Sequence, residues 1–248
     1  MTQAIIFAGP SLPPALRPAD SHLEWRDPVR QGELYQAARA RPVIIGVIDG
    51  YFEITPTVWH KEILWAMAQG IHVYGAASIG ALRAAELHAF GMKGIGCIFA
   101  GYRDGILSDD DEVAVLHAPK QLGYVPVTEA MVNIRATFDR AVAEGVLDGW
   151  LVPRLVEIGK ALFYKERDWD TILHIAGRSG LDAMSLDKLA TWVGYGRVEQ
   201  KRLDSLEMIE AIRSHLSRGV EPLIVSYEFH NTGYYQAATQ RSHNQNRA

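Results

Sequence analysis

The chain has 248 residues, and 25 Lys and Arg against 29 Asp and Glu give a formal net charge of −4 at pH 7. A hydrophobic share of 48% and a charged share of 22% are typical of a folded globular protein and exclude wholesale disorder. The single cysteine, Cys97, excludes a disulfide framework. Because Lys and Arg form no cluster, nothing supports a nucleic-acid partner. No apolar stretch approaches the roughly 20 residues that span a bilayer, and residues 1–4 lack the basic region of a signal peptide, so we expect a cytoplasmic protein with no membrane partner.

Short β-type runs alternate with helical segments through the first half of the chain. The strands expected there are residues 4–8, 42–48, 72–74 and 95–99, and the helices between them are residues 32–40, 57–69 and 81–90. Residues 42–48 form a continuous apolar run that ends at Asp49-Gly50, as in a strand buried on both faces of a parallel sheet. The alternation therefore favours a mainly parallel α/β sheet.

The β pattern largely disappears after residue 124, where amphipathic helical stretches take over. The helices expected there are residues 128–144, 153–164, 168–176, 185–193 and 198–216. We therefore predict an α/β fold with a mainly parallel-sheet N-terminal part, residues 1–123, followed by an α-helical part, residues 124–218. Residues 219–248 are expected to hold a short strand-like run at 223–227 and a mobile polar tail from 231 onward.

Residues 72–82 lead from a predicted strand through small residues and Ser78 into an Ala-rich helix. Such a layout is typical of a nucleophilic serine, whose Oγ must be exposed on a tight strand-to-helix bend, with the next N–H facing a developing oxyanion. Ala76, however, replaces the first glycine of the G-x-S-x-G pattern. Serine is also a good helix N-cap, so the spacing alone leaves both roles open.

A serine nucleophile needs a base, and the nearest ionisable groups lie in the helix predicted over residues 57–69. At about 100° per residue, Lys61 falls on an apolar sector of that helix. Desolvation there would favour the neutral amine, which can act as a general base. Equally, the stem of Lys61 could cover apolar surface while its ammonium reaches water. His60 is the alternative base, although an isolated histidine is more often structural.

Two other turns follow predicted strands and should lie at the same sheet edge, where parallel sheets bind ligands. Backbone N–H groups near Gly9 could complete an oxyanion site, and Asp49 could orient a lysine or a water, although Gly and Pro here are also ordinary turn formers. Arg83 and Glu86 are spaced i, i+3 and should pair, with a substrate carboxylate as the alternative partner of Arg83.

The acidic run of residues 108–112 predicts a helix start, where carboxylates favour the helix dipole. It lacks the alternating spacing of an EF-hand, so we assign no metal, although a metal at the turn of residues 109–112 stays open. The glycines form neither a dinucleotide nor a P-loop pattern, and no cofactor is implied. Cys97 falls in an expected apolar strand, which predicts a buried thiol.

Several segments of the first half, in this order and spacing, resemble the TfuA-like proteins, which are encoded beside YcaO enzymes in peptide-modification pathways. They are residues 6–12, 49–52, 58–64, 75–87, 90–92 and 110–114. Ile79 stands where the family more often has methionine, an apolar exchange. The resemblance implies a partner of a YcaO enzyme in peptide backbone thioamidation, which releases sulfide from the thiocarboxylate of a ThiS-like carrier protein and assists binding of the precursor peptide.

The resemblance also implies that Ser78 is the nucleophile and Lys61 its base. The N–H groups of Ile79 and Gly9 would stabilise the tetrahedral charge. The substrate contacts assigned with them are Arg83, His60, Asp49 and Ser11. Two other functions are consistent with the residues: a non-catalytic adaptor that docks YcaO and the precursor peptide, and a generic small-molecule serine hydrolase.

Overall fold

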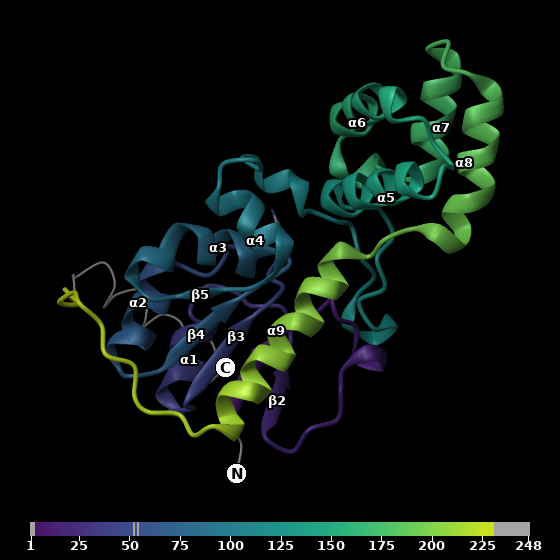
Figure 1. The fold of residues 1–248 in the computed structure, drawn as a ribbon. Helices are drawn as coiled ribbons and strands as arrows, with labels where there is room; N and C mark the ends of the chain where they lie inside the picture. Colours follow the sequence, from purple (N-terminus) through teal and green to yellow (C-terminus); the bar gives the residue numbers. More distant parts are fainter. Residues whose placement is uncertain (1–2, 52, 54, 231–248) are drawn as a thin grey trace. The chain divides into compact units, whose positions relative to one another are not determined.

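The computed structural model describes residues 3–51, 53 and 55–230 (Figure 1). They form two compact units. The first contains the described residues of Met1–Leu107 and Asp204–Ala248, and the second is Ser108–Leu203. These bounds differ from the three consecutive segments expected from the sequence, because the last helix returns the chain to the first unit.

The first unit is built on a five-stranded sheet in which every neighbouring pair of strands is parallel. Its strands are β1 (Ala4–Phe7), β2 (Leu23–Arg26), β3 (Ile44–Val47), β4 (His72–Gly75) and β5 (Lys93–Gly94). The strand order is β2-β1-β3-β4-β5, with β2 on one side of β1 and β3 on its other side. The direction in which the chain adds strands therefore changes between β1 and β3. In sheets of this kind, ligands bind outside the carboxyl ends of the strands at such a switch point.

Helices cover both faces of this sheet. They are α1 (Glu33–Arg39), α2 (His60–Ala68), α3 (Ile79–Leu87), α4 (Gly96–Arg103) and the part of α9 (Gln200–Ser217) from Asp204 onward, with 3-10 turns at Pro14–Leu16 and His88–Phe90. The side chains of Ile6, Ile44 and Tyr74 point to one face and pack with Met208 and Ile212 of α9. Successive strand residues point to opposite faces of the sheet. The buried residues that flank these three in their strands therefore point to the other face. The predicted parallel α/β sheet is confirmed.

The second unit is helical, as the sequence predicts. It contains α5 (Met131–Ala143), α6 (Val152–Ala161), α7 (Trp169–Arg178), α8 (Ala183–Gly196) and the start of α9, with 3-10 turns at Asp110–Glu112, Lys120–Leu122, Gly149–Leu151 and Tyr164–Glu166. Its core repeats at helical spacing, with Ile134, Phe138 and Ala141 on one side of α5. Asp168 and Asp182 cap α7 and α8 by accepting N–H bonds from Thr171 and Ser185.

The strand predicted over residues 95–99 is wrong. β5 ends at Gly94, and α4 begins at Gly96 with the N–H of Ile98 donating to Asp204 Oδ2 at 2.8 Å. A carboxylate more than 100 residues away thus satisfies a helix start that has no local cap. Cys97 is consequently exposed on a helix and not buried in a strand. Partial burial nevertheless raises the pKa of its thiol, and the charges of Asp204 and Glu207 raise it further.

Residues 223–227 do not form the strand expected there. They run beside α2, where the N–H of Leu223 donates to the carbonyl of Gly70 at 2.8 Å and Tyr227 Oη donates to the carbonyl of Leu64 at 2.7 Å. Burial raises the pKa of Tyr227 to about 12. The tail predicted from residue 231 lies outside the described residues. Among the helices of the described part, none is long and apolar enough to cross a membrane.

Candidate functional site

The turn between β4 and α3 is strained just before Ser78. Ala77 has a φ of +66°, and the N–H of Ser78 donates to the carbonyl of Ala76 at 2.8 Å. A bond from residue i+2 to residue i around a positive φ defines the rare form of γ-turn, which costs free energy in a residue with a Cβ. The predicted tight strand-to-helix bend is therefore present, with its left-handed residue at Ala77.

Two glycines let the start of α3 lie directly against the end of the sheet. A Cβ on Gly80 would lie 1.8 Å from the carbonyl oxygen of Val47, and one on Gly75 would lie 2.1 Å from the carbonyl oxygen of Gly80. The N–H of Gly80 donates to the carbonyl of Ile48 at 3.2 Å. Backbone thus packs on backbone at this point, and the small residues around Ser78 are a packing requirement.

The side chain of Ser78 does not act as a helix cap. It occupies the N-cap position of α3, yet its oxygen accepts no bond from the first turn. Ser78 keeps 9% of its surface exposed, and within the described residues Oγ has no hydrogen-bond partner. The adjacent N–H of Ile79 likewise has no acceptor among them. A hydroxyl and an open N–H therefore lie together at the positive end of a helix.

Asp49 organises the neighbouring loop at the switch point between β1 and β3. Its carboxylate is almost fully buried and accepts the N–H of Gly9 at 2.8 Å, the N–H of Ser11 at 3.0 Å and Ser11 Oγ at 2.6 Å. Asp49 therefore holds the loop that follows β1, and among the described residues no lysine is hydrogen-bonded to it. The Gly9 N–H, expected as a second oxyanion donor, is committed to this carboxylate, as is the Ser11 hydroxyl.

Lys61 lies in the first turn of α2 and is half-buried. Its Nζ donates to the carbonyl of His230 at 3.4 Å. Within the described residues, no hydrogen bond joins Lys61 to Ser78. The structure therefore places the predicted base at the same end of the unit as the serine, because α2 begins after β3, but leaves it bonded to another group.

A set of polar side chains ties the start of α2 to α3. Glu86 accepts from Arg83 Nη1 at 2.6 Å and lies 2.8 Å from His60 Nε2. Arg83 Nε also donates to the carbonyl of Val58 at 3.1 Å. The predicted pairing of Arg83 with Glu86 is confirmed, and both Arg83 and His60 are engaged within the protein.

The sequence did not single out Glu62, which fixes the start of α2. Its buried carboxylate accepts the N–H of Trp59 at 3.2 Å and the N–H of Tyr35 at 3.3 Å. Burial raises its pKa, and the hydrogen bonds only partly oppose that shift. A glutamate three residues after a helix start is the local signal that could have identified it.

The acidic turn of residues 109–112, in the second unit, is engaged by cations of its own unit. Lys160 Nζ pairs with Asp109 and Asp111, Arg167 with Asp111, and Arg135 with Glu112. These side chains account for the acidic run as a set of ion pairs. Among the described residues, no group of three or more His, Cys, Asp or Glu side chains is arranged to hold a metal ion.

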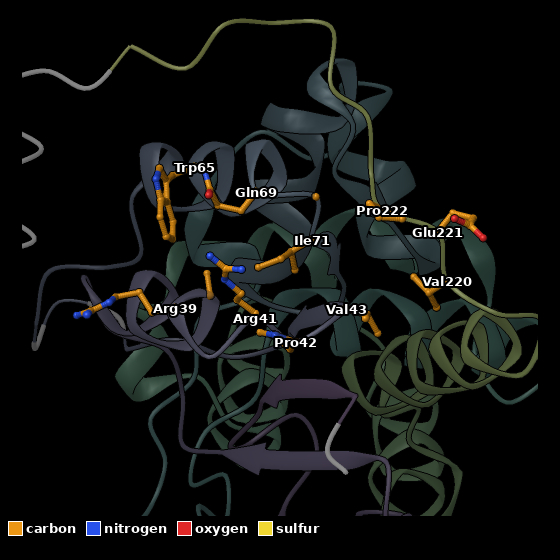
Figure 2. A pocket seen from close by; sticks show the side chains of 12 residues that line it. Arg39, Arg41, Pro42, Val43, Trp65, Gln69, Ile71, Val220, Glu221 and Pro222 are labelled. Carbon is orange, nitrogen blue, oxygen red and sulfur yellow. The ribbon is translucent and has the colours of Figure 1, made fainter.

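A cavity of about 490 Å³ lies at the amino-terminal ends of β3 and β4, opposite the strand ends that lead to Ser78 and Asp49. Its wall includes Trp65, Ile71 and Pro222, and in Figure 2 the guanidinium of Arg41 lies between Trp65 and Ile71. Ligands of parallel sheets bind at the carboxyl ends of the strands. The edge that holds Ser78 and the Asp49 loop is therefore the better candidate for chemistry.

Comparison with protein families gives a match over part of the chain. Residues 49–168 match the model of the TfuA-like protein family. The matched stretch includes both Lys61 and Ser78, and it confirms the resemblance seen in the sequence; the segment of residues 6–12 lies outside it. No curated protein matches the chain.

Proposed function

From the premise that residues 49–168 are TfuA-like, we propose that this protein releases sulfide from a ThiS-like carrier that ends in a thiocarboxylate, and so serves a YcaO enzyme in peptide backbone thioamidation. The observation that carries the proposal is the strained turn at Ala77, which presents the unbonded hydroxyl of Ser78 beside the open N–H of Ile79. The family resemblance supplies the substrate and the partners, including the precursor peptide, and the turn supplies the nucleophile.

The first step forms an acyl-serine. Lys61 takes the proton of Ser78 while Oγ attacks the carbon of the carrier's terminal thiocarboxylate. The tetrahedral intermediate collapses as its carbon–sulfur bond breaks, and the departing sulfur takes the proton from Lys61 and leaves as hydrosulfide. The N–H of Ile79 and the positive end of α3 stabilise the negative charge on the oxygen.

The second step regenerates the enzyme. Lys61 takes a proton from water, the resulting hydroxide attacks the ester carbon, and Ser78 Oγ leaves with the proton that Lys61 returns. The carrier departs as a carboxylate, so one thiocarboxylate and one water give one carboxylate and one hydrogen sulfide. No redox partner is needed, because the oxidation state of the carbon does not change.

Lys61 must exchange its partner for this chemistry. Its Nζ is bonded to the carbonyl of His230, and general-base action requires it to come within hydrogen-bond reach of Ser78 Oγ. The flexible four-carbon stem of lysine permits such a movement, and catalytic contacts often tighten only when the substrate is bound.

Sulfide release from a purified thiocarboxylated ThiS-like carrier tests the proposal. Ser78→Ala should lower the rate by at least about 10³-fold, because it removes the nucleophile, and Lys61→Met by about 10² to 10⁴-fold, because it removes the base. Ser179→Ala, which changes an exposed serine of the helical unit, should leave the rate unchanged.

His60→Gln identifies the base. Because His60 pairs with Glu86, this variant should keep most of the activity that Lys61→Met loses; the reverse pattern would assign the base to His60. Absence of release by the parent protein, with YcaO binding intact, would contradict the hydrolase and favour the adaptor. Rapid turnover of simple esters without the carrier would favour a generic serine hydrolase.

A further inference from the structure

Four basic side chains gather around Tyr74 at the amino-terminal edge of the sheet, opposite the edge that carries the serine turn. His72 begins β4 and Lys93 begins β5, while His215 belongs to the last turn of α9 and Arg218 follows that helix directly. With Glu221 and its neighbours they line a cavity of about 530 Å³. None of these residues takes part in the chemistry proposed for Ser78.

Hydrogen bonds fix the direction in which one imidazole presents its proton. Lys93 Nζ donates to Tyr74 Oη at 3.4 Å, and Tyr74 Oη lies 2.9 Å from His215 Nδ1. Tyr74 Oη accepts from the ammonium and has one proton of its own to donate, and we assign Nδ1 of His215 as the acceptor of that proton. The proton of neutral His215 is then on Nε2, the nitrogen that Tyr74 does not engage.

His72 is only 8% exposed, and one of its nitrogens lacks a partner. Its Nε2 lies 2.9 Å from the carbonyl oxygen of Glu221, so this nitrogen carries the proton. Nδ1 is buried without a hydrogen bond. A buried polar atom in this state is rare in folded proteins and calls for an explanation.

The positive charges of this cluster are not neutralised within the described residues. No carboxylate there lies within ion-pair distance of Lys93 or Arg218, and Glu221, which also lines the cavity, pairs with neither. Burial lowers the pKa of Lys93, and the charge of Arg218 lowers it further. Burial also lowers the pKa of both histidines, and the charge of Lys93 adds to each shift.

The helix dipole explains only part of this arrangement. Basic residues near a helix C-terminus are favourable, which accounts for His215 and Arg218 at the end of α9. It does not account for Lys93, which comes from the sheet and lies 5.1 Å from the Tyr74 ring, or for the unpartnered nitrogen of His72. A bound anion would account for Lys93 and Arg218, and an anion that also carries a proton would supply a partner for His72 Nδ1.

We propose that this cavity binds a phosphate group, held by Arg218 and Lys93 with the Nε2–H of His215 as a third donor. A guanidinium and an ammonium are the usual cations for phosphate. Phosphate is favoured over carboxylate because a phosphate oxygen can still carry a proton near neutral pH, which His72 Nδ1 can accept because the ring proton of His72 is on Nε2. The site is independent of the function proposed for Ser78.

Calorimetric titration of the full chain with inorganic phosphate, at constant ionic strength, tests the site. The parent should bind phosphate saturably, and Arg218→Gln and Lys93→Gln should each weaken binding about tenfold or more. Arg178→Gln is the matched control, because Arg178 is an exposed arginine in the last turn of α7, and it should bind like the parent. Circular dichroism verifies that each variant is folded.

Two further titrations identify the source of the phosphate group and its coupling to protons. Phenyl phosphate that binds more tightly than inorganic phosphate would indicate an ester ligand contacting Pro222 and Ile224; equal affinity would indicate free phosphate. Sulfate, whose charge is constant in this range, should bind more tightly as the pH falls from 7.5 to 5.5. Protonation of the two histidines then adds charge beside Lys93, Arg218, Tyr74 and Glu221.

Three results would overturn the proposal: no saturable binding of phosphate or of phenyl phosphate by the parent, an equal loss of affinity in Arg178→Gln, or equal displacement by chloride at the same ionic strength. The last two would show that the anion only screens surface charge.

Discussion

At the scale of single residues, the role proposed for Ser78 depends on the backbone around it. Its hydroxyl does not cap α3. The turn that presents the hydroxyl contains Ala77 in a left-handed conformation, and glycines allow the start of α3 to pack closely against the sheet. Strain of this kind persists only where the surrounding structure enforces it. Changes to the contacts under the turn should therefore alter the site without touching the hydroxyl.

Gly80→Ala tests the close approach of α3 to β3. Because the new Cβ would lie 1.8 Å from the carbonyl oxygen of Val47, the start of α3 must move, and we expect a loss of about 1–3 kcal/mol in the free energy of unfolding together with slower sulfide release. Gly194→Ala is the control, since Gly194 lies within α8 with open space around it, and it should be neutral or stabilising by up to about 1 kcal/mol. Urea unfolding measures both, and an equal effect of the two would contradict the packing argument.

Asp49→Asn tests the loop at the switch point. An amide cannot accept the three bonds that Gly9 and Ser11 donate to this buried carboxylate, so the variant should lose about 2–4 kcal/mol of unfolding free energy. Ser11→Ala, which removes only the hydroxyl bond, should cost less, about 1–2 kcal/mol. Chemical denaturation gives the ranking, and an equal or larger loss for Ser11→Ala would show that Asp49 is not the organising residue.

At the scale of elements, the start of α2 depends on a buried carboxylate. Burial raises the pKa of Glu62 in the folded state, so between the ordinary glutamate pKa and this raised value the folded protein holds more protons than the unfolded chain. The contribution of Glu62 to stability is therefore greatest below pH 4.5 and falls as the pH rises through that window.

Glu62→Gln should remove this pH dependence. The parent should lose unfolding free energy relative to the variant as the pH rises from about 4.5 toward neutrality, because only the parent must ionise a buried group. Denaturant midpoints measured across this range give the difference. A difference that stays constant, or that changes in the opposite direction, would contradict the burial argument.

Elements with strong internal patterns could be predicted from the sequence, and those that depend on distant residues could not. The apolar run that became β3 and the helical repeat of α5 each carry their own signal. By contrast, α4 starts where the carboxylate of Asp204 meets the N–H of Ile98, a contact that no local pattern contains. β2 was missed because its edge position leaves only Leu23 buried.

The same distinction holds for the candidate site. Ser78 stood out because small residues bracket it between a strand and a helix, which is a local signal. The hydrogen bond from the Gly9 N–H to Asp49 could not be predicted, because the two residues are 40 positions apart and no local pattern identifies the acceptor. Likewise, Lys93 and Arg218 are far apart in the sequence, and only the fold brings them to the same cavity.

At the scale of the whole molecule, the described residues form two compact units. The first carries the serine turn, and both lie partly within the TfuA-like match. The second is a helical unit whose acidic turn is occupied by its own cations. The covalent bond that we propose between Ser78 and the carrier would form in the first unit.

Intact-protein mass spectrometry tests that bond most directly. The protein is mixed with thiocarboxylated carrier and quenched in acid at short times. We expect a transient adduct of protein plus carrier with loss of hydrogen sulfide, which peptide mapping places on Ser78 and which is absent from Ser78→Ala. Sulfide release by Ser78→Ala at the parental rate, with no adduct in either protein, would contradict it.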